Sequence, residues 1–149
     1  MAVNTSPTFP LTPKTSWVNL TTATVSNSDL TTGYQSVYTA GSDGGIVQKL
    51  IIQPLGTSTT PATFPAGVFK VFINNGSAVG TQSNNTLLRE MLFPVLTNGL
   101  DADSTTLLVP FTECILNIQL QATYKLYVGY TGALSSAISI NVTAISTDY

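Results

Sequence analysis

Apolar and polar residues alternate in short segments along most of the chain. The clearest segment spans 137–145 and places four apolar residues on one side of an extended backbone: Ile138, Ile140, Val142 and Ala144. A period of two residues is the signature of a strand that buries one of its faces. Comparable segments, bounded by Gly, Asn, Ser or Asp, predict further strands over 21–25, 34–40, 46–53, 68–73, 87–95, 105–111 and 124–130.

A helical period of 3.6 residues does not stand out in any window of about 11 residues. The segment 87–93 is the one competitor, because Leu, Arg, Glu and Met favour helices intrinsically. Pro94 and the Asn84-Asn85 turn leave room for two helical turns at most, so we predict a strand there.

Turn residues separate the predicted strands. Gly-Ser-Asp-Gly-Gly at 41–45 predicts a turn, and Asn-Asn-Gly at 74–76 is a hairpin signal because Asn and Gly tolerate positive φ. About eight antiparallel strands joined in this way predict an all-β fold, a β-sandwich of the jelly-roll type.

The first 16 residues differ from the rest in composition. Pro7, Pro10 and Pro13 recur every three residues, which excludes a helix and favours an extended arm. We therefore divide the chain into an N-terminal arm, 1–16, and one sandwich domain, 17–149, although a disordered terminus is an alternative for the arm. The large apolar residues Phe9 and Leu11 of the arm, with Trp17 directly after it, are candidates for anchoring the arm on a neighbouring subunit.

Charge is scarce in this chain of 149 residues: 8% of them are Asp, Glu, Lys or Arg, and the net charge is −2. A typical globular domain has about 25%. Low net charge gives little repulsion between copies, so the chain suits packing against partners. The five basic residues are scattered, which argues against a nucleic-acid partner. No apolar run is long enough for a spanning helix or a signal peptide, so we expect no membrane partner.

The residues that usually carry catalysis are few. The chain has no His, and Cys114 is its only cysteine, so we expect no internal disulfide and a buried, unreactive thiol. Asp101 and Asp103 are the only close acidic pair, but threonines occupy further ligand positions of a calcium loop. Glu90 and Glu113 show no spacing that favours a glycosidase over surface ion pairs. We therefore expect no enzyme activity, no catalytic residues, no cofactor and no metal.

Seven segments, taken in order, carry a family resemblance: 37–46, 47–54, 68–76, 87–94, 107–110, 120–128 and 142–149. In this order the chain resembles a short virion protein that many tailed-phage genomes carry near the major capsid gene. The resemblance covers about residues 17–149, and no single motif in it is specific. The family's usual Leu-Pro-Ala-Gly-Tyr turn stands here as Leu-Gln-Ala-Thr-Tyr at 120–124, which loses the Pro and Gly that would fix the turn.

The resemblance implies a capsid decoration, or cement, protein. Such a protein is a trimeric β-sandwich that lies on the outside of the head where capsomers meet and stabilises it. Its partners would be the major capsid protein and further copies of itself. It would be made in the host cytoplasm and located on the virion, with Phe9, Leu11 and Trp17 as capsid or subunit contacts.

Two other roles stay open at this point. Six tyrosines and a surface rich in Asn and Thr would also suit a host-surface or glycan-binding module of a phage fibre or tail. Another structural protein of the tail or neck is the second alternative.

Overall fold

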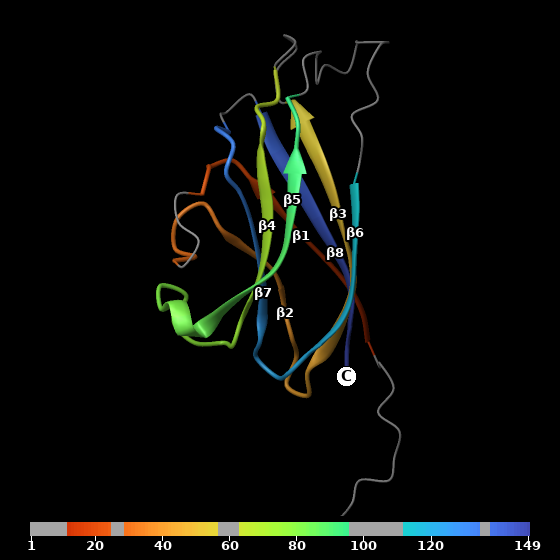
Figure 1. The fold of residues 1–149 in the computed structure, drawn as a ribbon. Coiled ribbons are helices and arrows are strands. Elements are labelled where there is room, and N and C mark those ends of the chain that lie inside the picture. The colour runs from red at the N-terminus through yellow and green to blue at the C-terminus, as the bar shows by residue number, and fades with distance from the viewer. Residues whose placement is uncertain (1–11, 25–28, 57–62, 96–111, 135–137) are drawn as a thin grey trace, which may run out of the picture.

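The structure is a computed structural model that describes residues 12–24, 29–56, 63–95, 112–134 and 138–149. Within these ranges the chain forms eight strands and one short 3₁₀ turn, Gln82–Asn84 (Figure 1). The strands are β1 (Thr12–Leu20), β2 (Gln35–Thr39), β3 (Gly45–Gly56), β4 (Gly67–Asn74), β5 (Asn85–Phe93), β6 (Thr112–Leu120), β7 (Lys125–Tyr130) and β8 (Ile138–Asp148). The predicted all-β class and strand number are confirmed, including the strand in place of the helix at 87–93.

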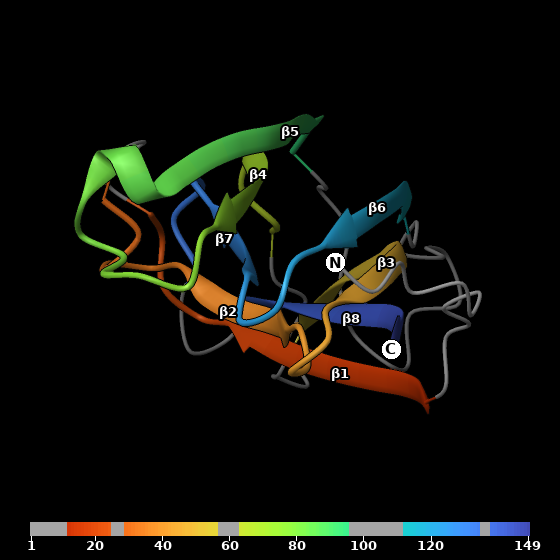
Figure 2. The ribbon, with the colours of Figure 1, turned by 90° about the horizontal axis from the view of Figure 1, so that it is seen from below.

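The strands form two four-stranded sheets, in the orders β1-β8-β3-β6 and β2-β7-β4-β5, and every pairing is antiparallel. The two sheets lie face to face as layers (Figure 2). Of the described strands, only β4 and β5 follow each other within one sheet; every other pair of consecutive described strands belongs to different sheets. This strand order is that of an eight-stranded jelly roll, so the predicted sandwich type is confirmed.

The core lies between the sheets and is built from the predicted alternation. The apolar positions of β8 that the sequence marked are all buried: Ile138, Ile140, Val142 and Ala144. They face buried side chains of the opposite sheet, among them Phe69, Val71, Leu126 and Val128. At one end of the core Tyr130 packs against Phe64, with ring centroids 5.3 Å apart, and its hydroxyl donates to the Pro65 carbonyl at 2.6 Å.

Two strand boundaries differ from the prediction. β1 begins at Thr12 and pairs with β8 from Thr12 opposite Asp148, so residues 12–16 belong to the sheet rather than to the arm. The strand predicted at 21–25 is wrong for its described part, because β1 ends at Leu20. Thr24 instead turns inward, is buried, and donates its N–H to the Tyr130 carbonyl at 2.8 Å. This tertiary contact overrides the β-propensity of the threonines in the segment 21–24. The strand predicted at 105–111 lies outside the described residues.

A bulge changes which side chains of β2 are buried. The sequence places Tyr34, Ser36, Tyr38 and Ala40 on one side, but the pairing of β2 with β7 shifts between Ser36 and Tyr38. As a result Val37 and Tyr38, although adjacent, are both buried. An extra residue in one strand produces this change of face, and no local sequence pattern marks it.

The two predicted turns are present. Gly44 has φ +94° and donates its N–H to the Gly41 carbonyl at 3.2 Å, which closes the turn at 41–45. Gly76 has φ +86° after β4, as the Asn-Gly signal predicts. The connection between β4 and β5 is longer than a tight hairpin, because the chain continues through the 3₁₀ turn before β5 begins. The buried Asn74 holds it together by donating to the Asn85 side chain at 2.8 Å.

Candidate functional site

Trp17 lies on the outward face of the sheet β1-β8-β3-β6 and is 70% exposed. The pairing register forms two neighbouring rows of side chains across this sheet. One row contains Trp17, Thr143 and Ile51. The next row contains Ile145, Lys49 and Ile115. Ile115 is 51% exposed. We call the following residues the outer sheet face: Thr15, Trp17, Lys49, Ile51, Glu113, Ile115, Thr143 and Ile145. An exposed Trp near isoleucines on the outward face of a sheet is a feature that marks a contact surface.

Charge on the outer sheet face is neutralised internally. Lys49 and Glu113 form an ion pair, with Nζ and Oε1 2.5 Å apart. Among the described residues of the four strands, these two are the only charged side chains that point outward from this sheet. A partner of the outer sheet face therefore meets a surface without net charge, and its binding should depend little on salt.

A second exposed apolar strip lies on the other sheet, along its edge strand β5. Leu92 is 79% exposed, and Leu87 and Val95 are about half exposed. β5 pairs with β4 alone, so one of its two edges is unpaired among the described strands. We call Leu87, Leu92 and Val95 the β5 strip. Exposed, unpaired edges of this kind associate readily with further chains.

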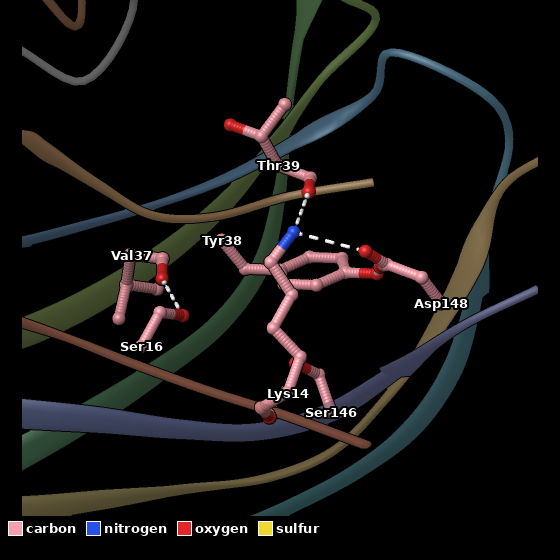
Figure 3. A network of polar contacts seen from close by, with 7 residues as sticks. All are labelled: Lys14, Ser16, Val37, Tyr38, Thr39, Ser146 and Asp148. Carbon is pink, nitrogen blue, oxygen red and sulfur yellow. Dashed lines mark hydrogen bonds and ion pairs between the residues drawn. The ribbon is translucent and has the colours of Figure 1, made fainter. Parts of the chain in front are cut away.

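A polar network connects the two sheets at the edge strands β1 and β2 (Figure 3). Lys14 Nζ lies 3.0 Å from Asp148 Oδ2, donates to the Thr39 carbonyl at 3.1 Å, and is 5.2 Å from the centre of the Tyr38 ring. The Tyr38 hydroxyl donates to the other carboxylate oxygen of Asp148. Beside them Ser16 Oγ donates to the Val37 carbonyl at 2.5 Å. We call Lys14, Tyr38 and Asp148 the seam network, since they hold β1, β2 and β8 together.

The seam network sets the ionisation of its own members. Burial disfavours the charged form of Asp148, but hydrogen bonds from Tyr38, Lys14 and the Gly41 backbone, with the charge of Lys14, lower its pKa below the usual value. Burial is the main cause that raises the pKa of Tyr38 above its usual value. The hydrogen bond to Asp148 and the negative charge of Asp148 raise this pKa further. Burial also raises the pKa of Tyr130 to about 12. The native protein thus prefers a charged carboxylate and neutral phenols.

We predict a flat dependence of stability on pH between about 5 and 9, because the chain has no His. The lowered pKa of Asp148 contributes stability above its unfolded pKa of about 4, which is lost as pH falls through the folded value. The raised pKa values of Tyr38 and Tyr130 contribute stability below about pH 10, which is lost as pH rises further. Urea unfolding at a series of pH values measures this. A midpoint that changes strongly between pH 6 and 8 would contradict it.

The thiol and the strand carboxylates that the sequence offers for chemistry are buried or ion-paired. Cys114 is buried, and burial raises the pKa of its thiol, although the charge of Arg89 acts in the opposite direction. The raised pKa keeps the thiol protonated. Glu113 pairs with Lys49 and Glu90 lies 3.4 Å from Lys70, as expected for ion pairs rather than an acid pair. In the described ranges no three His, Cys, Asp or Glu side chains gather as a metal site would require. No helix of those ranges is long and apolar enough to cross a membrane.

The candidate contact residues fare differently. Trp17 stands exposed on the outer sheet face, whereas Phe9 and Leu11 lie outside the described residues, as do Asp101 and Asp103. The seam network was not expected from the sequence, because Lys14 and Asp148 are 134 positions apart. The isoleucines around Trp17 come from three other strands, β3, β6 and β8, that are distant in the sequence, so no local signal reveals them either.

No protein-family model and no curated protein matches this chain. Among solved structures it is similar to a chain of the cyanophage Pam1 capsid asymmetric unit, with a TM-score of 0.44 and 16% sequence identity. The match covers 99% of this chain and 94% of that chain. A capsid-related protein is thus one of its distant structural neighbours, and a likeness this distant adds no weight to any particular function.

Proposed function

We propose that this chain is a structural virion protein of a phage, which binds the outside of the capsid and stabilises the head. The observation that carries the proposal is Trp17, 70% exposed on the outer sheet face. A free monomer gains nothing from displaying a Trp in water, whereas an interface gains from burying it. In this proposal the outer sheet face contacts the capsid, and the protein acts by binding rather than by catalysis.

Two further features of the molecule support a binding role. The Lys49–Glu113 pair leaves the outer sheet face without net charge, so it can pack on an apolar surface without leaving an unpaired charge buried. The β5 strip belongs to the other sheet, so the molecule has two separate apolar surfaces. A protein that links its neighbours on a lattice needs at least two contact surfaces.

The test uses phage particles produced without this protein. Purified chain is added back, and its bound copies per head are counted together with the temperature at which heads release DNA. The proposal predicts saturable binding of many copies, a higher release temperature, and little change in affinity between low and high salt. Binding of only a few copies per particle, or heads that are no more heat-resistant with the protein, would overturn it.

We further propose that the protein acts as a homotrimer, with the β5 strip buried between subunits. Leu92, at 79% exposure, would be the main apolar contact. We predict that the chain has three times its monomer mass in solution, and that Leu92→Arg, which places a charge in the contact, converts it to monomer. Light scattering after size exclusion measures both, and Gln82→Ala, an exposed change in the 3₁₀ turn, serves as the control. A monomeric wild type, or a Leu92→Arg variant that stays trimeric, would contradict this assignment.

A further inference from the structure

A polar depression lies at the end of the sandwich where the chain's last residues meet two turns. It has a volume of about 320 Å³ and is lined by Asp43, Gln119, Leu120, Gln121 and Tyr149. These residues come from the 41–45 turn, the end of β6, the β6–β7 turn and the end of β8. Neither the outer sheet face nor the β5 strip includes any of them. Its volume is at the lower end of the range for small-molecule sites.

Backbone hydrogen bonds fix the walls of the depression. Tyr149 donates its N–H to the Gly44 carbonyl at 3.3 Å, and Tyr124 donates to the Gln121 carbonyl at 3.1 Å. Position 44 requires a glycine, because the residue has φ +94° and a Cβ there would lie 2.6 Å from the Leu120 carbonyl oxygen. The turn at 41–45 therefore lies directly against the end of β6, and the site does not need to form on binding.

The groups in the depression match a neutral, polyhydroxylated ligand. Gln119 Nε2 donates to the Tyr149 hydroxyl at 2.6 Å, which orients the aromatic ring and leaves the Gln119 carbonyl oxygen as an acceptor. Gln121 is exposed and supplies a second amide, and Asp43 supplies a carboxylate. Amides and a carboxylate offer donors and acceptors for adjacent hydroxyls, while the ring offers an apolar plate for the C–H face of a sugar.

Charge excludes the competing classes of ligand. The described residues that line the depression include no Lys or Arg, so a phosphate or sulfate would meet the Asp43 carboxylate without a compensating cation. A bound metal ion would need several oxygen ligands around it, and Asp43 is the one carboxylate among the lining side chains. An apolar ligand would cover the Gln121 amide and the Asp43 carboxylate without offering either of them a hydrogen bond.

We propose that this depression binds a neutral saccharide, with the Tyr149 ring against the sugar and Asp43, Gln119 and Gln121 bonded to its hydroxyls. None of the side chains that define the outer sheet face lines the depression, so the saccharide proposal does not rest on the proposed function. A protein on the outside of a virion with such a site would also hold the particle weakly on a polysaccharide-coated surface.

The test titrates the full chain with neutral di- to tetrasaccharides of glucose, galactose, mannose and N-acetylglucosamine, and follows backbone amide shifts by NMR. We expect at least one sugar to bind with a Kd on the order of 1 mM and to shift the amides of Asp43, Gln121 and Tyr149. Tyr149→Ala and Gln121→Ala should each weaken binding about tenfold or more. The same sugars immobilised at high density separate recognition of a polysaccharide coat from that of a free sugar.

Two controls keep the outcomes distinguishable. Gln53→Ala removes an exposed glutamine further along β3 and should leave sugar binding unchanged. Trp17→Ala should also bind sugar as the wild type does, whether or not it attaches to capsids. Absence of any shift at these three amides with every sugar, or equal binding by Tyr149→Ala, would overturn the saccharide site. If Trp17→Ala loses capsid binding but still binds sugar, the saccharide site and its assigned residues stand.

Discussion

Trp17→Ala should bind phage heads about 30- to 150-fold more weakly than the wild-type chain. Burying a large aromatic side chain that is otherwise exposed contributes about 2 to 3 kcal/mol, which corresponds to that change in affinity. Because Trp17 is 70% exposed in the free chain, most of this contribution is available to a partner. Add-back of fluorescently labelled variant to heads that lack the protein measures the change directly.

Stability separates a lost contact from a lost fold. Trp17 points away from the core, so Trp17→Ala should change the free energy of unfolding by no more than about 0.5 kcal/mol. Gln82→Ala, an exposed substitution away from both apolar surfaces, should bind heads as the wild type does. If Trp17→Ala binds with unchanged affinity, the outer sheet face is not the capsid contact.

Gly45→Ala should destabilise the fold by about 3 kcal/mol or more. A Cβ at position 45 would overlap the Tyr38 hydroxyl and lie 2.7 Å from the Thr147 carbonyl oxygen. Tyr38 would have to leave its hydrogen bond to Asp148, and the pairing of β3 with β8 would have to shift. Urea unfolding of the two proteins gives the difference in the free energy of unfolding.

A double-mutant cycle tests the cause of that loss. Tyr38→Phe removes the hydroxyl that the new methyl would meet, so Gly45→Ala should cost about 1 kcal/mol less in that background. Tyr38→Phe alone should cost roughly 1 to 2 kcal/mol, since it removes one hydrogen bond to a partly exposed carboxylate. Additive effects of the two substitutions would show that the strain at position 45 does not act through Tyr38.

The elements that the sequence predicts best are those with one fully buried face. β8 is the clearest case, because the four apolar residues that alternate from Ile138 to Ala144 all enter the core. β2 shows the limit, since a bulge after Ser36 buries two adjacent residues. β6 is not among the predicted strands, because an apolar residue, Ile115, also occupies an exposed position and interrupts the alternation.

The candidate site is predictable only in part for a related reason. The sequence identifies Trp17 as a large apolar residue near the start of the domain, but the direction of its side chain depends on where β1 begins to pair with β8. The seam network depends on a jelly-roll order that brings Asp148 beside Lys14 and Tyr38. Long-range pairing of this kind is set by the whole topology, so no local motif predicts it.

The central claim is that the chain is a virion protein whose outer sheet face lies on the capsid. A cryo-electron microscopy map of the intact particle, at a resolution that shows side chains, tests it most directly. The proposal predicts a jelly roll in many copies on the outside of the head, with Trp17 and Ile115 buried against the capsid shell. Heads without such density, or copies whose Trp17 faces solvent while another surface meets the capsid, would contradict it.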